Sequence, residues 1–277
     1  MRTPTRLVPF ALVLAAAPAA AWDDCAHRVP RNLDLSADGV TTLAVRAKAG
    51  SLSIRGAGAG SAIAVRGEAC ASEESELAEI RIVESRQGST LVLTVEMPET
   101  EAWSWGDNYR TLDLDLTVPA RLALEVQDSS GEAEIRGVAS LTIQDSSGEL
   151  EIQSIAGDVE IRDSSGEIDV RDVGGDLNIP ADSSGEITAR HVRGNAEIDH
   201  DSSGSITLSD IGGDAIVGTD SSGDIEFDRI TGSARVGKDS SGSIEARDVG
   251  RDFVVRSDGS GGISHHGVRG LVDVPEE

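Results

Sequence analysis

The chain has 277 residues, with 49 Asp and Glu against 24 Lys and Arg, 31 Gly and only 7 aromatic residues. The net charge of −25 excludes the phosphate contacts of a nucleic-acid binder and disfavours an anionic membrane surface. Ile, Val and Leu recur at regular intervals through the second half of the chain, whereas disordered segments lack such a pattern.

Residues 1–21 have the pattern of a signal peptide. Arg2 and Arg6 form a basic start, an apolar run follows, and Ala19 and Ala21 stand in the A-x-A arrangement that signal peptidase accepts. We expect cleavage after Ala21, which removes two Arg and takes the net charge from −25 to −27. No later segment has the roughly 20 apolar residues of a membrane helix. The sequence therefore predicts a periplasmic or secreted protein with no membrane insertion after cleavage.

Cys25 and Cys70 are the two cysteines of the chain, and export would bring them into an oxidising compartment. We expect a disulfide between them, which would tie the mature N-terminus to a later strand. The alternatives are two unpaired core residues or redox-active thiols. Redox chemistry is disfavoured because the two residues do not have a C-x-x-C spacing.

Residues 22–127 contain short runs in which apolar and polar residues alternate, and such runs predict strands. The runs lie at 43–45, 52–54, 63–65, 80–82, 91–95 and 112–119. Only 72–77 has the composition of a helical turn.

Trp103, Trp105 and Tyr109 form the one aromatic cluster of the sequence. Their loop could stack on sugar rings or dock a partner, because aromatic side chains bury large areas in such contacts. The alternative is that the loop folds back over the neighbouring strands as a lid.

An internal repeat fills residues 128–277. The tetrad Asp-Ser-Ser-Gly begins at Asp128 and recurs at intervals of 17, 18 and then 19 residues, ending in a variant that begins at Asp258. The second, fourth and seventh positions after each tetrad glycine are mostly apolar. The second position holds Ala133, Leu150, Ile168, Ile187, Ile206, Ile225, Ile244 and Ile263. Each repeat therefore has two short segments of period 2 between glycine-bearing turns, which predicts strands rather than helices.

One repeat offers only about five apolar side chains and cannot bury them alone, but stacked repeats share a continuous narrow core. We therefore predict an all-β fold, a parallel β-solenoid with coils of about 19 residues, whose handedness the sequence leaves open. Eight coils about 4.8 Å apart would extend over about 38 Å. The predicted organisation is a signal peptide at 1–21, an irregular N-terminal set of coils or cap at 22–127, and the regular solenoid at 128–277.

Stacking would place the tetrad aspartates in a column on the outside of the rod, where like charges about 4.8 Å apart repel each other. A divalent cation such as Ca²⁺ between coils would offset the repulsion, with Asp163, Asp182, Asp201, Asp220 and Asp239 as candidate ligands. The alternative is turn chemistry, in which Asp and Ser bond nearby backbone amides, Gly supplies a positive φ, and salt screens the carboxylates. We favour turn chemistry, because the spacing differs from the glycine-rich nonapeptide of calcium-binding solenoids.

The repeated serines and the histidines do not form a catalytic pattern. A nucleophilic serine needs one activated hydroxyl beside a base and an orienting group, whereas the tetrad serines recur in coil after coil. We expect His191 and His200, and the pair His265-His266, to be exposed or hydrogen-bonded residues without a catalytic or metal-binding role. The sequence thus predicts no catalytic residue, and no cofactor apart from the calcium hypothesis.

The order of motifs resembles a known family. G-S-L-S-I-R-G at 50–56 is followed by A-I-A-V-R-G, a longer excursion to L-V-L-T-V, then L-D-L-D-L-T-V-P and serial G-x-I-x-V repeats. This order is similar to that of the bacterial putative-adhesin domains, also called toast-rack domains, over nearly the whole mature chain. The resemblance implies a β-solenoid in an exported or envelope protein associated with surface attachment or envelope stress systems.

From these features we expect an exported, non-enzymatic module of the bacterial envelope, an adhesin or structural scaffold whose partner is an unidentified envelope or surface component or a glycan. One alternative is an envelope-stress or cation-responsive periplasmic element. Another is a polysaccharide-active enzyme, which would need a cluster of acidic residues outside the repeat ladders.

Overall fold

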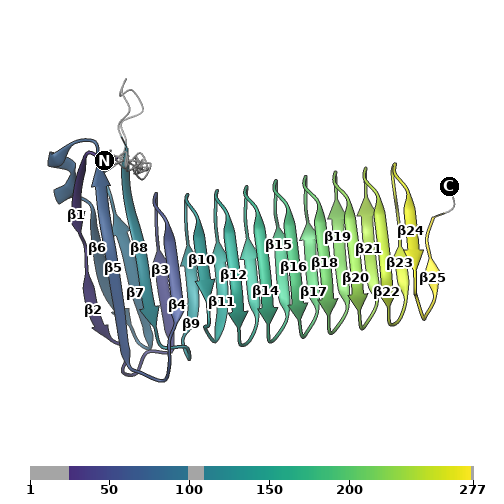
Figure 1. Ribbon diagram of the computed structural model, residues 1–277, viewed down its shortest axis with the longest axis horizontal. Coiled ribbons are helices and arrows are strands. Elements are labelled where there is room, and N and C mark those ends of the chain that lie inside the picture. The colour runs from purple at the N-terminus through teal and green to yellow at the C-terminus, as the bar shows by residue number, and fades with distance from the viewer. Residues whose placement is uncertain (1–24, 99–108, 276–277) are drawn as a thin grey trace, which may run out of the picture.

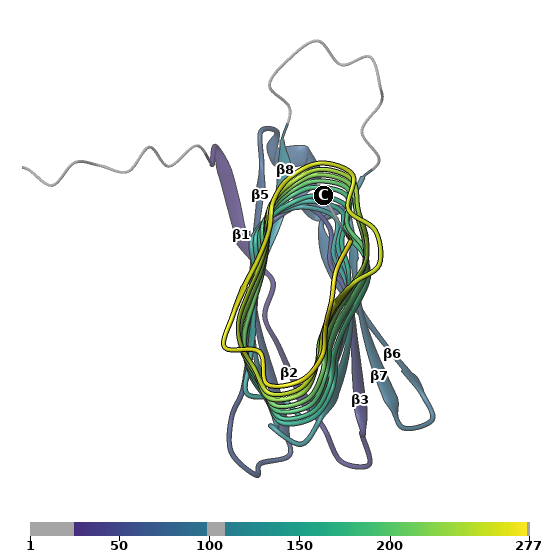
Figure 2. The ribbon, with the colours of Figure 1, turned by 90° about the vertical axis from the view of Figure 1, so that its right-hand side faces the viewer.

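The structure is a computed structural model that describes residues 25–98 and 109–275. Two β-sheets face each other along a rod, and each coil of the chain contributes one strand to each sheet (Figure 1). Viewed along the rod, the coils superpose as a flattened oval (Figure 2). The predicted parallel β-solenoid with coils of about 19 residues is confirmed.

The first sheet has 13 strands. In spatial order these are β1 (His27–Pro30), β5 (Ala62–Ala71), β8 (Arg110–Val118), β4 (Leu52–Gly56), β10 (Ala133–Arg136), β12 (Leu150–Ile155), β14 (Ile168–Val173), β16 (Ile187–Val192), β18 (Ile206–Ile211), β20 (Ile225–Ile230), β22 (Ile244–Val249) and β24 (Ile263–His266), with β2 (Leu33–Ser36) also paired to β5.

The second sheet has 12 strands. In spatial order these are β25 (Val272–Asp273), β23 (Phe253–Val255), β21 (Ala234–Asp239), β19 (Ala215–Asp220), β17 (Ala196–His200), β15 (Leu177–Ala181), β13 (Val159–Arg162), β11 (Ser140–Gln144), β9 (Ala123–Gln127), β3 (Thr42–Arg46), β7 (Thr90–Glu96) and β6 (Arg81–Gln87).

The core lies between the two sheets and consists of the apolar columns. Parallel pairing keeps the repeats in register, so that Ile187 lies beside Ile168 on one side and Ile206 on the other. The second-position residues from Ala133 to Ile244 are at most 1% exposed, and the seventh-position residues from Val138 to Val249 are equally buried. Because each inward side chain packs on those at the same position of the neighbouring coils, every coil adds a further layer of buried apolar surface.

The N-terminal coils do not stack in the order in which they occur in the chain. Strand β4 pairs in parallel with β8 on one side and β10 on the other, and β3 lies in the same way between β7 and β9. Residues 42–56 therefore form a coil that is inserted between two coils built from later residues. Antiparallel pairing of β1 and β2 with β5, of β5 with β8, and of β6 with β7 closes this end of the rod. The predicted helical turn near 72–77 is the 3₁₀ helix η1 (Glu74–Ala78).

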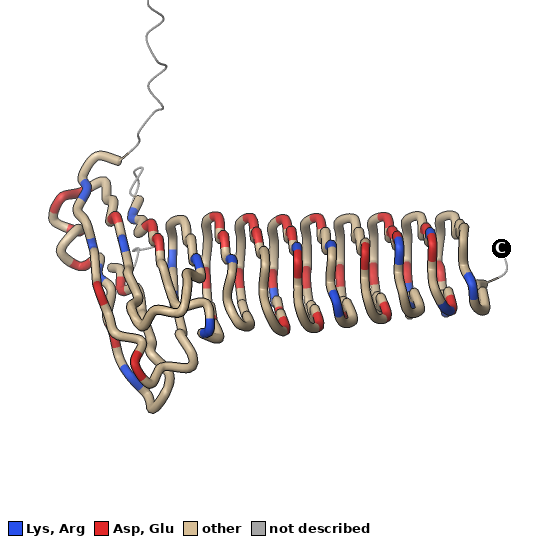
Figure 3. Tube along the Cα trace, turned by 60° about the horizontal axis from the view of Figure 1, so that its bottom comes forward, with Lys and Arg blue, Asp and Glu red and all other residues tan. Residues whose placement is uncertain are grey.

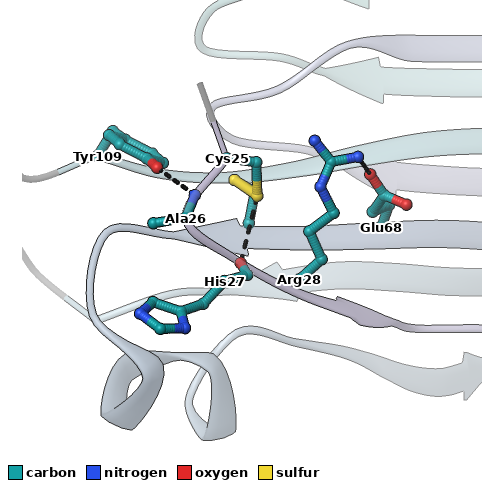
Figure 4. The surroundings of a disulfide bond; sticks show 7 residues. Cys25, Ala26, His27, Arg28, Glu68 and Tyr109 are labelled. Atoms are coloured by element: carbon teal, nitrogen blue, oxygen red, sulfur yellow. Dashed lines mark hydrogen bonds and ion pairs between the residues drawn. A yellow bond between two sulfur atoms is a disulfide. The ribbon is translucent and has the colours of Figure 1, made fainter. Parts of the chain in front are cut away.

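The predicted disulfide between Cys25 and Cys70 is present, with a Cα–Cα distance of 5.8 Å. It joins the segment before β1 to the end of β5 (Figure 4). The Tyr109 hydroxyl accepts a hydrogen bond of 2.6 Å from the Ala26 backbone N–H, and Arg28 pairs with Glu68 at 3.0 Å across β1 and β5. These contacts hold the first strand on the N-terminal end of the rod.

Replacing both cysteines, Cys25→Ser with Cys70→Ser, is expected to lower the free energy of unfolding by about 3 to 4 kcal/mol, because the bridge closes a loop of 45 residues in the unfolded chain. Urea denaturation followed by circular dichroism measures the change. Reductant should lower the midpoint of the parent and leave that of the double variant unchanged. An equal midpoint for parent and double variant would show that the disulfide contributes nothing to the stability of the rod.

Candidate functional site: the inner aspartate ladder and the corner groove

Each regular coil has two turns, and the tetrad turn leads from the second sheet into the first. Its aspartates point into the rod and are at most 5% exposed; they are Asp128, Asp145, Asp163, Asp182, Asp201, Asp220 and Asp239, which we call the inner aspartate ladder. The expectation that these carboxylates lie outside is therefore wrong. In the short coils the inside–outside alternation simply continues from Ile143 through exposed Gln144 to Asp145. In a 19-residue coil two outward residues, Gly218 and Thr219, precede buried Asp220, so the extra residue is absorbed before the tetrad.

The tetrads carry the turn chemistry that we favoured over calcium binding. The Asp182 Oδ1 atom accepts a hydrogen bond of 2.8 Å from the Ser183 backbone N–H, and other tetrads repeat this contact. The second serine reaches back one coil, as where the Ser222 hydroxyl donates to the Ser202 carbonyl at 3.2 Å. The tetrad glycine has a positive φ, and a Cβ atom at Gly185 would lie 1.6 Å from the Gly166 carbonyl oxygen. The serines thus have structural partners.

The second carboxylate oxygen of each ladder residue is the unusual feature. The Oδ2 atoms of all seven are buried without a hydrogen-bond partner among the described residues. Burial therefore raises the pKa of Asp128 to about 7, and raises that of Asp182 and Asp220 to about 6; neighbouring carboxylates in the ladder add to each shift, whereas the serine N–H groups oppose it. A proton on the ladder removes the charge that burial disfavours.

The five candidate calcium ligands lie in this ladder, with one carboxylate in each coil. Within residues 25–98 and 109–275, no three or more His, Cys, Asp or Glu side chains converge as a metal-binding group. Calcium binding by Asp163, Asp182, Asp201, Asp220 and Asp239 stays a prediction.

Each strand of the first sheet from β12 to β22 has a positive φ at its second-last residue, and this bend before the turn is here called the left-handed corner. The corner residues are Ser154, Asp172, His191, Asp210, Arg229 and Asp248, with φ between 53° and 59°. Non-glycine residues seldom adopt this conformation, and Asn, Asp and His adopt it most readily. Six consecutive coils repeat this conformation, so the corner is a regular feature of the fold rather than a local irregularity.

Aspartates alternate with His191 and Arg229 along this corner. The His191 Nδ1 atom lies 3.3 Å from an Asp172 carboxylate oxygen, and its Nε2 atom lies 3.7 Å from Asp210. The Arg229 Nε atom lies 2.6 Å from the Asp210 Oδ1 atom, and this hydrogen bond lowers the pKa of Asp210. Asp248 follows in the next coil. The aspartates of this column are therefore separated from one another by a coil that carries a hydrogen-bond donor, whereas aspartates in successive coils would repel each other.

Side-chain size alternates from coil to coil at the position two residues after the corner residue. Glycine occupies this position at Gly174, Gly212 and Gly250, and the coils between them have Arg193 and Thr231. A Cβ atom at Gly212 would lie 2.3 Å from the Arg193 carbonyl oxygen, so this position excludes a side chain. Small residues beside the corner leave a surface groove of about 890 Å³ over five coils, here called the corner groove. A groove of about 520 Å³ continues it past Asp248 to Arg269.

The other residues singled out from the sequence lie elsewhere. Trp103 and Trp105 fall outside the described residues, and Tyr109 lies beside the disulfide (Figure 4). His265 packs against Phe253 with ring centres 6.1 Å apart. The acidic residues recur coil after coil along the rod (Figure 3). Sequence reasoning missed the corner groove, whose signal is the pairing of Asp with a following Gly in alternate coils: Asp172 with Gly174, and Asp210 with Gly212.

Comparison with known proteins identifies the fold. No family model matches the chain, and no curated protein matches it. A solved structure named a putative lipid binding protein, from Parabacteroides distasonis, has 16% identity and a TM-score of 0.50, covering 89% of this chain and 97% of that one. A putative adhesin from Bacteroides fragilis has 16% identity and a TM-score of 0.34, covering 90% and 98%. A putative cell adhesion protein from Clostridium sporogenes has 12% identity and a TM-score of 0.31, covering 91% and 100%. The first likeness supports the β-solenoid fold that the toast-rack resemblance implies.

The inner aspartate ladder should make the rod less stable as the pH rises. A folded-state pKa above the unfolded value of 3.8 contributes stability that is complete below about pH 4 and is lost as the pH rises through about 6 to 7. Asp182→Asn, which carries no charge, should therefore raise the free energy of unfolding at pH 8 by roughly 1 to 3 kcal/mol and leave it unchanged near pH 4.

Urea denaturation at each pH measures this difference. The matched control, Glu197→Gln, removes one exposed carboxylate from the neighbouring strand β17 and changes the net charge equally. If the two variants gain the same stability at pH 8, long-range charge repulsion rather than the ladder is responsible.

The calcium hypothesis predicts a higher melting temperature in millimolar Ca²⁺ than in chelator, because a cation bound to the folded state stabilises it. Differential scanning calorimetry at pH 7.5 measures the shift, and Mg²⁺ at equal concentration controls for ionic strength. Asp201→Asn should reduce the shift. Equal melting temperatures in Ca²⁺ and chelator would show that the ladder does not bind calcium.

Proposed function

We propose that the chain is an exported, non-enzymatic binding module of the bacterial envelope that acts as an adhesin or scaffold. The observation that carries the proposal is the rod itself, on which the corner groove runs along five successive coils. Solenoids use such extended surfaces to bind partners, because neighbouring repeats present equivalent groups at a fixed spacing.

The distribution of reactive groups supports a binding role over catalysis. Catalysis by carboxylates needs two accessible groups in distinct environments, whereas the ladder carboxylates are enclosed and equivalent. The hydroxyl of the second tetrad serine donates to the preceding coil. In the part of the chain that the structure describes, the exposed chemical groups thus form repeated columns rather than one reactive cluster.

Export is supported by two independent features. Residues 1–21, which lie outside the described residues, have the pattern of a signal peptide. The Cys25–Cys70 disulfide is of a kind that forms and persists in oxidising compartments such as the periplasm. Among the described residues, no helix is long and apolar enough to cross a membrane.

Lipid binding, named for the Parabacteroides distasonis structure, has less support in this chain. A lipid-binding protein needs an apolar cavity for the acyl chain. In the regular coils the space between the sheets is filled by side chains such as Leu208, Phe227 and Ala246, each fully buried. We therefore place the binding surface on the outside of the rod.

Cell fractionation and envelope binding test the proposal. The mature chain is expected in the periplasm or the medium with Trp22 as its first residue. The purified protein should bind isolated envelopes saturably in a sedimentation assay, and heat-unfolded protein should not. Retention of the uncleaved chain in the cytoplasm, or binding that does not saturate, would contradict the proposal. Binding seen in Ca²⁺ and lost in chelator would favour the cation-responsive alternative.

A further inference from the structure

We propose that the corner groove binds a neutral polysaccharide strand lying along the axis of the rod. The proposal rests on the binding function above and names its ligand class and its site. It depends on the length of the groove, the alternation of hydrogen-bond acceptors and donors along it, and the rigidity of the backbone that forms it.

The shape of the groove fits a linear ligand. It runs from Ser154 in one coil to Thr231 four coils later, and neighbouring strands are about 4.8 Å apart, so it is about 19 Å long. The continuation to Arg269 adds two coils and brings the total to about 29 Å. A compact small molecule would fill only part of it, whereas an extended chain can contact every coil.

The alternation of hydrogen-bond acceptors and donors favours a neutral, hydroxyl-rich chain. Asp172 and Asp210 accept hydrogen bonds, whereas His191 and Arg229 offer donors in the coils between them. A sugar hydroxyl both donates and accepts, so it can pair with either kind of side chain. Arg193 is exposed and has no ion-pair partner among the described residues, which leaves its guanidinium available to a ligand.

Charged polymers fit less well. An acidic polysaccharide would meet the corner aspartates and the field of a chain whose net charge is −25. A cationic polymer would be drawn to acidic columns all along the rod and would be repelled within the groove by Arg193 and Arg229. A neutral chain avoids both costs.

An extended peptide is also disfavoured. Peptides that bind along a sheet usually pair with unoccupied backbone groups of an edge strand. Here the backbone already bonds from coil to coil, as where the Gly212 N–H donates to the Val192 carbonyl at 2.8 Å and the Thr231 N–H to Ile211 at 2.8 Å. The groove offers side chains to a ligand rather than a free backbone edge.

The site is rigid before the ligand arrives. The corner backbone is fixed by these bonds, and the side chains of Asp210 and Arg229 already hold each other in place. A ligand therefore orders few groups on the protein when it binds, which favours affinity in a shallow site.

Isothermal titration with cellohexaose, mannohexaose, chitohexaose and hexagalacturonate tests the proposal. At least one neutral hexasaccharide should bind, more tightly than its disaccharide, and more tightly than the acidic hexagalacturonate. Thr231→Trp places a large side chain in the lining that the two grooves share and should weaken binding about tenfold or more. Asp210→Asn and Arg193→Ala should each weaken it severalfold, because each removes one hydrogen-bonding group.

The matched control is Thr142→Trp, which places the same side chain at an exposed position of β11, outside the corner groove. It should bind like the parent, and equal melting temperatures of the two Trp variants would show that both are folded. The proposal is overturned if no neutral hexasaccharide binds, if Thr231→Trp binds as well as Thr142→Trp, if the acidic hexasaccharide binds more tightly, or if a Gly-Ser dodecapeptide competes for the groove.

The same variants separate this proposal from the general one. If Thr231→Trp still binds isolated envelopes like the parent, the chain is an envelope-binding module whose contact surface lies elsewhere, and only the groove assignment fails. If the parent binds neither envelopes nor neutral hexasaccharides, both proposals fail.

Discussion

The parallel, in-register stacking of coils governs the rest of this structure. Backbone hydrogen bonds hold neighbouring strands about 4.8 Å apart, and register places each side chain beside its own equivalents, as with Ile187 and Ile206. For apolar residues this arrangement is favourable, because the side chains at equivalent positions pack on each other. For charged residues it is unfavourable, and the structure shows two different arrangements that reduce the repulsion.

In the tetrad turns the aspartates lie inside, where most of them accept backbone hydrogen bonds and burial raises their pKa, which favours loss of the charge. At the left-handed corner the side chains stay outside, and aspartates alternate with His191 and Arg229 from Asp172 to Asp248, which requires a sequence period of two coils rather than one. The first arrangement stabilises the turn. The second leaves donors and acceptors exposed in a regular series, which is the basis of the binding surface that we propose.

Much of the fold was predictable because its signals are local. The period of the tetrads, the apolar columns and the two cysteines specify the coil, the core and the bridge. The inward aspartates were also within reach, since the alternation through Gln144 continues to Asp145, but the longer coils hide it behind one extra residue. The position of β3 and β4 was not predictable, because periodicity does not specify which strand edge a segment joins. The groove depends on backbone φ values and on a pattern that repeats every two coils. Aligning the repeats one by one does not reveal such a pattern.

The inserted coil has a consequence for the order of folding. A regular repeat can pair with its neighbour across a loop of one coil, so the loop-closure entropy is small. Strand β4 instead finds both partners, β8 and β10, much later in the chain, at Leu114 and Ala133 for Leu52. In a chain that is synthesised from its N-terminus, residues 42–56 find no parallel partner until β7 and β8 follow, and both neighbouring coils are present only once residue 136 has been made. This coil therefore cannot be completed before the first regular repeat has been made.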